Sequence, residues 1–306
     1  MSSLPLTRRF DLRPLAARDL PAVIEIDAAL GGRPRRAYFE RRLAAAARDA
    51  ARHLQLGVDA GGRLAGYMLG RTLEGEFGRT EPEVRLEAFG VAAAAQRQGL
   101  GRALAAAFED QALKRGLHGI RTTARWREHA LLGFLDRAGY GLERAHVLDR
   151  PAKPDLDPEA RDTYEVALLQ ESDLAGVARI DRRHTGRDRR GFLCSTVREA
   201  LADSAVRVSL AARADGEIAG YVMARVDYGD YGRSEPVAVI DTVGVDPLRL
   251  HQGVGKALLS QLFMNLAGFG VERVETVVES GKLDLMGLFC SAGFAPSERL
   301  SFVKKL

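Results

Sequence analysis

The sequence predicts an α/β protein made of two similar mixed α+β domains in tandem. The first observation is an internal repeat, since residues 98–104 read QGLGRAL and residues 252–258 read QGVGKAL. The second is that an alignment at this offset of 154 residues continues without a gap: LAGYMLGR (64–71) matches IAGYVMAR (218–225). The third is that each half shows the same order of expected strands and helices. The length of 306 residues also fits two domains of ordinary size.

The repeat spans a whole domain, which indicates an internal duplication and not a solenoid. We therefore expect a first domain over 1–150 and a second over 163–306. The segment 151–162 between them is rich in proline and charged residues, as expected of a linker.

The elements follow the same order in both halves, judged from apolar periodicity and glycine turns. In the first half we expect a helix over 18–30, a strand pair over HLQLGVDA and GGRLAGYMLGRTL, a strand over 84–91, a helix over about 99–115, a strand over 119–124 and a helix ending at Gly139. The second half repeats this with a helix over 171–181, a strand pair around Asp215-Gly216, a strand over 237–245, a helix over about 253–268, a strand over 271–278 and a helix ending at Gly293. The late strand–helix–strand unit of each half predicts a parallel crossover, whereas the early strands are antiparallel.

Composition narrows the class of protein. The formal net charge is +4 with dispersed arginines, which suits an anionic ligand and does not indicate nucleic acid. No apolar run is long enough for a membrane span, and the first residues lack the apolar core of a signal peptide, so we expect a cytoplasmic protein. Cys194 and Cys290 are expected to be reduced, buried thiols, and neither they nor the six histidines show metal-ligand spacing.

Each copy of the glycine turn follows an expected strand and opens an expected helix. Glycines let the backbone approach a ligand closely, and the first N–H groups of a helix have no partners within the helix. Such a corner can bind an anion such as a pyrophosphate. The spacing differs from a dinucleotide fingerprint, since Leu104 and Leu258 stand where the third glycine would be. A plain strand–helix corner remains the alternative.

The segment Gln96-Arg97-Gln98-Gly99-Leu100-Gly101 resembles the Q/R-x-x-G-x-G/A signature of the GNAT family of acyl-CoA-dependent N-acyltransferases. VGVDPLRLHQGVGKAL in the second half is similar, with Leu250 in the first position of the signature. The resemblance covers nearly the whole chain and implies two tandem GNAT-like domains that form an intramolecular pseudo-dimer. It also implies acetyl-CoA, or another acyl-CoA, as co-substrate, lying between the splayed fourth and fifth strands of a domain.

The resemblance assigns the acyl-CoA contacts to the end of the fourth strand and to the glycine loop. In the first half these are Phe89, Gly90, Val91, Gln96, Arg97, Gln98, Gly99, Leu100, Gly101, Arg102 and Ala103. In the second half they are Val243, Gly244, Val245, Leu250, His251, Gln252, Gly253, Val254, Gly255, Lys256 and Ala257.

Glu87 and Asp241 occupy the same position of the repeat, in apolar strands just before the loop. Because many GNAT enzymes carry a carboxylate on this strand as general base, the resemblance implies that role for both. A solvated or arginine-paired carboxylate is the alternative. The family's usual acid, a tyrosine, is replaced by Leu135 and Phe289.

Two arginine-rich loops, GGRPRR (31–36) and TGRDRR (185–190), fall where the family binds the acceptor. Their arginines would bind a carboxylate or phosphate of the acceptor. Solvated surface arginines, or contacts between the halves, are the alternatives. Asp27 and Asp181 are expected to pair with these arginines, and binding of the acceptor amine is the alternative.

The predicted function is transfer of an acetyl group from acetyl-CoA to an amine, on a small molecule or a peptide N-terminus. One alternative within this class is acetylation of a small thiol-bearing amine, as in the two-domain mycothiol synthases. An alternative from another class is a non-catalytic acyl-CoA-binding module. A third alternative is that one half is degenerate and serves as a structural partner of the active half. Further oligomerisation stays open.

Overall fold

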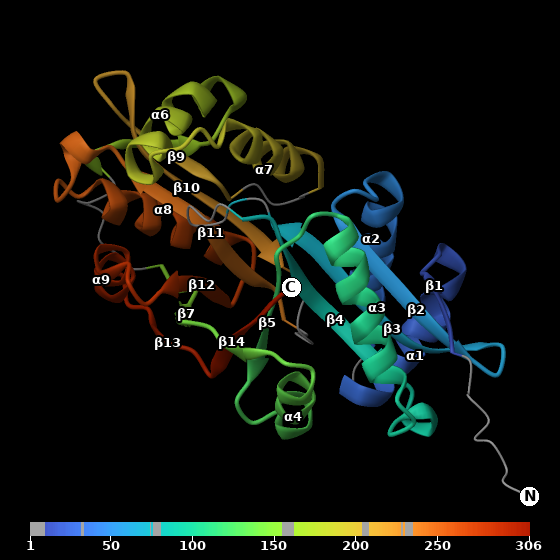
Figure 1. Cartoon of the computed structure of the whole chain (residues 1–306). Coiled ribbons are helices and arrows are strands. Elements are labelled where there is room, and N and C mark those ends of the chain that lie inside the picture. Colours follow the sequence, from blue (N-terminus) through green and yellow to red (C-terminus); the bar gives the residue numbers. More distant parts are fainter. Residues whose placement is uncertain are drawn as a thin grey trace, which may run out of the picture.

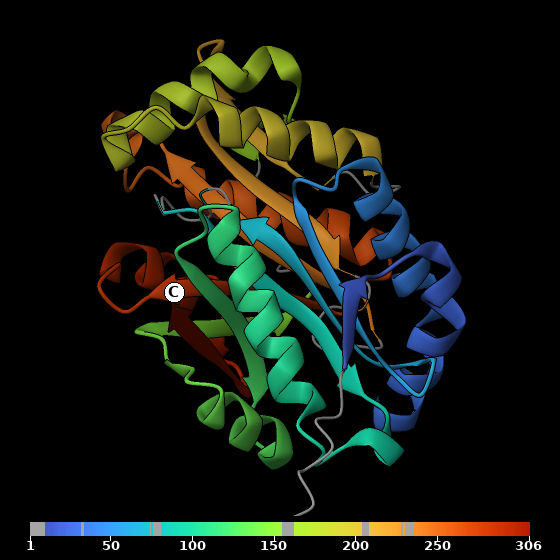
Figure 2. The same ribbon diagram turned by 45° about the vertical axis from the view of Figure 1, so that its right-hand side comes forward.

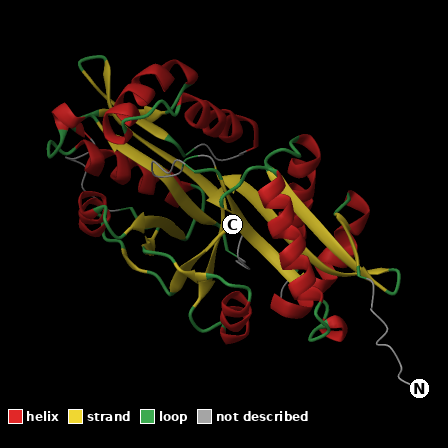
Figure 3. Cartoon of the chain, in the orientation of Figure 1, coloured by secondary structure: helices red, strands yellow, loops and turns green. Residues whose placement is uncertain are grey.

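The computed structural model describes residues 10–31, 34–73, 75, 81–154, 162–203, 208–227, 229 and 235–306. Within these residues the chain forms two seven-stranded sheets, one for each half of the repeat (Figure 1). Figure 3 shows the strands in the middle of the molecule, with helices on the outside. The α/β class and the tandem arrangement predicted from the sequence are therefore confirmed.

The first sheet has the strand order β1-β2-β3-β4-β5-β14-β6. Its strands are β1 (Asp11–Pro14), β2 (His53–Ala60), β3 (Arg63–Leu73), β4 (Glu83–Val91), β5 (Gly119–Arg125), β14 (Arg299–Lys305) and β6 (Gly141–Leu142). Only β4 and β5 run parallel, and the other neighbours are antiparallel.

The second sheet has the order β13-β7-β12-β11-β10-β9-β8. Its strands are β13 (Ala295–Pro296), β7 (Ala145–Pro151), β12 (Arg273–Glu279), β11 (Val237–Val245), β10 (Glu217–Asp227), β9 (Leu210–Ala214) and β8 (Glu165–Leu168). Here β11 and β12 are the parallel pair.

Helices cover both faces of each sheet. The first sheet carries α3 (Leu100–Lys114) and α4 (His129–Arg137) on one face, and α1 (Leu20–Gly31) and α2 (Arg36–Arg48) on the other. The second carries α8 (Val254–Gly268) with α9 (Leu283–Ser291), and α6 (Leu174–Thr185) with α7 (Arg190–Asp203). Figures 1 and 2 both show α3 lying across the strands of the first sheet. None of the described helices is long and apolar enough to cross a membrane.

The last strand of each half lies in the sheet of the other half. β14 pairs with β5 along its whole length, with Phe302 opposite Thr122. β7 pairs with β12 in the corresponding way, with Leu148 opposite Thr276. Each sheet is therefore completed by the other half, an exchange that the sequence did not predict. The domain limits at 150 and 163 stay a prediction.

The expectation that both cysteines are buried is wrong. Both are free thiols, but Cys290 is exposed and Cys194 is half-buried. Cys290 lies in the last turn of α9, next to the fully buried Phe289 that fills the core position.

Candidate active site

The two parallel strands of the first half separate after a short pairing. β4 and β5 pair only at Val84 with Ile120 and at Arg85 with Arg121. The Thr122 hydroxyl then donates to the Leu86 carbonyl oxygen at 3.0 Å, where a strand partner would otherwise be. Beyond this point β4 has no strand neighbour on its β5 side within the described residues.

The second half separates its parallel strands in the same way. Pairing of β11 with β12 ends at Val239 opposite Glu275. The Thr276 hydroxyl donates to the Ile240 carbonyl oxygen at 3.2 Å. Both halves therefore have the splayed strands in which the family resemblance places an acyl-CoA.

The two candidate carboxylates occupy β-bulges. In the β3–β4 ladder Leu69 faces Ala88 and Gly70 faces Leu86, so Glu87 is the extra residue. The bulge turns the strand, because Leu86 packs in the core under α3 whereas Ala88 packs in the core under α1 and α2.

Asp241 has the same place in the second half. Met223 faces Thr242 and Ala224 faces Ile240, which leaves Asp241 between them. A bulge that aims a carboxylate beside the splayed strands, present in both halves, is typical of a functional site.

Both glycine loops adopt the same conformation at the helix start. Gly99 and Gly253 precede α3 and α8 with φ of +89° each, a left-handed value that favours glycine. A Cβ on either residue would meet no atom within 4 Å, so open space lies beside the backbone. The first helical hydrogen bonds run from the N–H groups of Ala103 and Ala257 to the carbonyls of these glycines. The N–H groups between them therefore lie ahead of the helical ladder, as an anion site requires.

The first loop is held by its own glutamines. Gln96 Nε2 donates to the Val91 carbonyl at 3.0 Å, and Gln98 Nε2 donates to the Ala94 carbonyl at 2.8 Å. Arg97 between them has a left-handed φ of +59°. The loop is exposed and yet fixed at both ends.

The second loop replaces one of these bonds. Leu250, where the first half has Gln96, is exposed, and His251 takes the left-handed φ of +62°. The Val245 carbonyl is bonded instead by the His184 ring, at 2.6 Å from Nε2. The Gln252 side chain keeps the other bond, to the Leu248 carbonyl at 3.2 Å.

The remaining predicted contact residues lie along the same short path, from the end of the bulged strand to the first helical turn. Phe89 stacks on Phe134 of α4, with ring centroids 4.9 Å apart. A Cβ on Gly90 would come within 3.0 Å of the Tyr67 ring, so the strand packs too closely there for a side chain. The structure thus brings together Val91, Leu100, Gly101, Arg102 and Ala103 in the first half, and Val243, Gly244, Val245, Val254, Gly255, Lys256 and Ala257 in the second. Their contact with a ligand stays a prediction.

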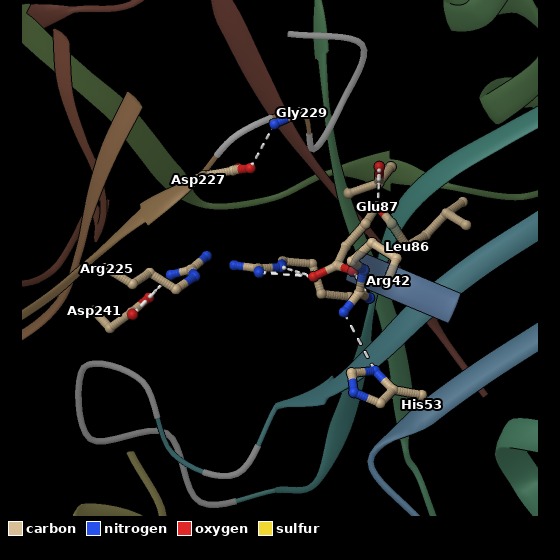
Figure 4. A network of polar contacts seen from close by, with 10 residues as sticks. Arg42, His53, Leu86, Glu87, Arg225, Asp227, Gly229 and Asp241 are labelled. Atoms are coloured by element: carbon tan, nitrogen blue, oxygen red, sulfur yellow. Dashed lines mark hydrogen bonds and ion pairs between the residues drawn. The ribbon is translucent and has the colours of Figure 1, made fainter. Parts of the chain in front are cut away.

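Glu87 is 2% exposed and bonded to two arginines. Its Oε2 accepts from Arg42 of α2 (Figure 4). Its Oε1 accepts from Arg85 of the same strand at 2.8 Å. Asp241 accepts from Arg225 of β10, whose Nη1 lies 2.5 and 2.7 Å from the two carboxylate oxygens. Both candidate bases are therefore arginine-paired, which is the alternative that the sequence left open.

His53 extends the network of the first half. Its Nδ1 lies 3.3 Å from Arg42 Nη1 (Figure 4). Burial, and secondly the charge of Arg42, lower the pKa of His53 to about 3. The imidazole is therefore neutral near pH 7, and its Nδ1 can accept a hydrogen bond from the Arg42 guanidinium.

The sequence analysis missed Arg42, His53 and Arg85. The aligned positions in the second half are Thr196, Arg207 and Val239, so a search for repeated residues passes over all three. One signal for Arg85 was present in the sequence. Arg85 and Glu87 are two residues apart in an expected strand, and residues at this spacing lie on the same face of a regular strand.

Apolar side chains occupy the position of the family's tyrosine acid in both halves. Leu135 and Phe289, where the family usually has its tyrosine acid, are 0% exposed and belong to the apolar cores. These positions therefore supply no proton donor.

The arginine-rich loops connect the halves. Arg35 pairs with Asp27 and also donates to the Gly229 carbonyl of the other half. Asp27 Oδ1 accepts in addition from the Tyr67 hydroxyl at 3.0 Å. Arg189 makes the equivalent bonds, to Asp181 of its own half and to the Gly75 carbonyl of the first half.

Of the roles considered for these arginines, Arg35 and Arg189 therefore have the contact between the halves. The expected pairing of Asp27 and Asp181 with arginines is confirmed. Arg36, Arg187 and Arg190 are exposed. Arg33 lies outside the described residues.

Comparison with known proteins agrees with this geometry. The model of the acetyltransferase (GNAT) family matches residues 20–140 and 182–294, so the chain belongs to this family, which generally uses acyl-CoA. A GCN5-related N-acetyltransferase from Sphaerobacter thermophilus has a similar fold, with a TM-score of 0.63, 19% identity, and coverage of 99% of this chain and 97% of that one. A tandem GNAT protein from the clavulanic acid biosynthesis pathway gives a TM-score of 0.62 at 18% identity, over 97% and 98% of the two chains.

Among curated proteins, a mycothiol acetyltransferase of Clavibacter sepedonicus is 37% identical over 109 residues. One from Clavibacter michiganensis subsp. michiganensis is 35% identical over the same length. In both cases the match spans 36% of this chain and 33% of the relative, so it covers about a third of their length.

Proposed function

We propose that the protein transfers an acetyl group from acetyl-CoA to an amine, forming an amide and releasing the CoA thiol. The observation that carries this proposal is the glycine loop, which presents an open helix N-terminus just beyond a pair of splayed strands, twice in one chain. Unpaired N–H groups and the helix dipole together favour a pyrophosphate at that place.

The transfer needs few catalytic groups from the protein, because the thioester of acetyl-CoA is already activated toward attack by an amine. A backbone N–H near Phe89–Val91 would polarise the thioester carbonyl, as the family resemblance implies. Glu87 would take the proton of the amine through a water molecule, since both of its oxygens already accept from arginines. With the apolar Leu135 at the usual acid position, the departing thiolate would take its proton from solvent.

The first half is the better candidate for the transfer. There the longer glutamate is supported by Arg42 and His53, and Gln96 completes the loop signature. In the second half, Asp241 has a shorter side chain and is bonded by Arg225 alone among the described residues. We assign to that half a second acyl-CoA loop and the role of completing the first sheet.

The proposed acceptor is an amine of a small molecule or a peptide. A small thiol-bearing amine belongs to this class, and the partial similarity to mycothiol acetyltransferases supports it. A specific observation also favours a non-catalytic acyl-CoA-binding module: both acid positions are apolar, and both candidate bases are bonded to arginine.

Calorimetric titration with acetyl-CoA, followed by measurement of thiol release with a panel of amines, tests the proposal. One or two bound acetyl-CoA per chain together with amine-dependent thiol release supports the transferase. Binding without thiol release for any amine supports the non-catalytic module. Absence of binding refutes both.

A further inference from the structure

A cavity of about 70 Å³ lies where the two halves meet. Residues of both sheets line it, among them Arg85, Thr122 and Thr123 of the first sheet and Arg225, Ile240 and Asp241 of the second. Thr122 and Ile240 belong to the points where the parallel strands separate in the first and second half, respectively. The cavity therefore adjoins both candidate acyl-CoA sites and belongs to neither half alone.

The acids in the cavity wall already have cations. Asp241 accepts from Arg225, Glu143 accepts from Arg121, and Glu275 lies 3.9 Å from Arg299. Glu143 also accepts from the Ser301 hydroxyl at 2.7 Å. The wall has little acceptor capacity left to satisfy further donors.

Two donors in the wall remain without acceptors in the described part of the chain. Arg225 uses Nη1 for both bonds to Asp241, and its Nη2 and Nε make no hydrogen bond there. The Thr123 hydroxyl has no partner although the residue is only 8% exposed. A buried hydroxyl without a partner costs free energy, which a bound acceptor would recover.

The two halves also present like charges to each other here. Arg225 extends from Asp241 toward the group of Glu87 and Arg42 (Figure 4), and Arg85 lines the same cavity. Burial lowers the pKa of Arg225 and the Arg85 guanidinium lowers it further, whereas the carboxylates of Asp241 and Asp227 raise it, so that the pKa is raised overall. An anion between the two guanidinium groups would offset their repulsion.

We propose that this cavity binds the carboxylate of the acyl acceptor, between Arg85 of the first half and Arg225 of the second, with the Thr123 hydroxyl as a further donor. The assignment to the acceptor rests on the proposed function. The volume admits a group of a few heavy atoms, since a buried water needs roughly 10–15 Å³. The amine would therefore lie outside the cavity, toward the splayed strands. The acceptor class is an amine that carries a carboxylate, such as an amino acid.

The first test measures thermal unfolding in sodium acetate, with sodium chloride at equal ionic strength and acetamide as the neutral analogue. Near saturation, acetate is expected to raise the Tm by about 2–4 °C, whereas acetamide and chloride do not. Thr123→Val should retain at least the wild-type Tm without acetate, because it removes an unpaired hydroxyl, and should lose most of the acetate response. Arg225→Gln should lose the response as well.

Arg179→Gln is the matched control, because it removes the same charge from a surface side chain that is 42% exposed. It should keep the full acetate response. Should Arg225→Gln prove unstable because Asp241 loses its cation, the double variant Arg225→Gln/Asp241→Asn removes both charges. A wild-type Tm that rises no more in acetate than in chloride overturns the proposal, and so does a full response in Thr123→Val.

The second test compares KM for alanine and alaninamide at equal concentrations of free amine, by thiol release from acetyl-CoA. We expect alanine to have at least a tenfold lower KM, and Arg225→Gln to abolish the difference. Equal KM values in the wild-type protein, with acetyl-CoA bound, overturn this proposal alone. Failure to bind acetyl-CoA overturns the proposed function, and the acetate titration then decides whether the cavity is an anion site.

Discussion

Replacing Gly99 by alanine tests the loop on which the proposed function depends. With φ at +89°, any side chain there costs about 1–2 kcal/mol of backbone strain. The added methyl group would meet no protein atom within 4 Å, so it enters only the space assigned to the pyrophosphate. Losing one charge-assisted hydrogen bond costs about 1.5–3 kcal/mol. The Kd for acetyl-CoA should therefore rise about ten- to hundredfold.

Gly116→Ala is the matched control. Gly116 follows the end of the same helix, has φ of +71°, and its Cβ would also meet nothing within 4 Å. Both variants should lose similar stability, about 1–2 kcal/mol, in thermal unfolding. Only Gly99→Ala should weaken acetyl-CoA binding in calorimetry. Wild-type affinity in Gly99→Ala, or an equal loss in Gly116→Ala, would refute the reasoning.

The second half contains the same pair of glycines. Gly253 has φ of +89° before α8, and Gly270 has φ of +68° after it, each beside open space. If both halves bind acetyl-CoA, Gly253→Ala should weaken one of the two classes of site about ten- to hundredfold, and Gly270→Ala should weaken neither. If the titration of Gly253→Ala matches the wild type, the second loop is only a strand–helix corner.

Three further predictions concern the buried charges. Glu87→Gln should lower kcat by at least about 10²-fold at unchanged acetyl-CoA affinity, whereas Asp241→Asn should leave kcat near the wild-type value and act on the KM of the acceptor through Arg225; equal losses of kcat would contradict the assignment to the first half. Because the pKa of His53 is about 3 in the folded protein and about 6.5 when unfolded, the unfolded chain binds the extra proton, and stability falls as the pH drops from 6.5 to 3. His53→Asn should flatten this part of the stability curve in denaturant titrations, and an unchanged slope would count against the buried neutral imidazole. Arg35→Met leaves Asp27 buried without its cation and should cost about 3–5 kcal/mol, of which Arg35→Met/Asp27→Leu recovers only a part, because the buried Tyr67 hydroxyl then loses its acceptor; a double variant more unstable than the single one would exclude the unpaired charge as the cause.

Much of the fold could be predicted because its signals are local. Alternating apolar residues placed strands over 53–60 and 237–245, which the structure has as His53–Ala60 and Val237–Val245. The glycine turn placed the helix after it, observed as Leu100–Lys114. Comparison of the two halves strengthened each assignment of a strand or helix, because a sequence pattern that occurs in both halves is less often due to chance.

The features that escaped prediction depend on contacts between distant segments. β7 and β14 have the same position in the repeat. Each of these strands could therefore pair with β5 or with β12, and no local sequence pattern decides between the two. The arginines around Glu87 come from another helix and from one half only, so neither spacing nor repetition reveals them. The bulge that carries Glu87 is likewise a property of the pairing between two strands.

The strand exchange leads to a prediction about the first half in isolation. A chain of residues 1–154 contains β5 but lacks β14, which covers the edge of β5 from Gly119 to Arg125. An open edge beside a buried core invites pairing with another chain. The chain's own β7 is the repeat equivalent of β14, so two copies can exchange β7 and each complete the other's sheet, as a closed two-fold dimer.

Light scattering after size exclusion should therefore find a dimer for residues 1–154. Because the whole chain already pairs both exchanged strands internally, the two halves together form the same unit that two copies of one half would form. A stable, well-folded monomer would show that the first half closes its sheet with its own last strand. The exchange would then be a choice between two nearly equal pairings, and the duplication would not have been needed to complete the sheet.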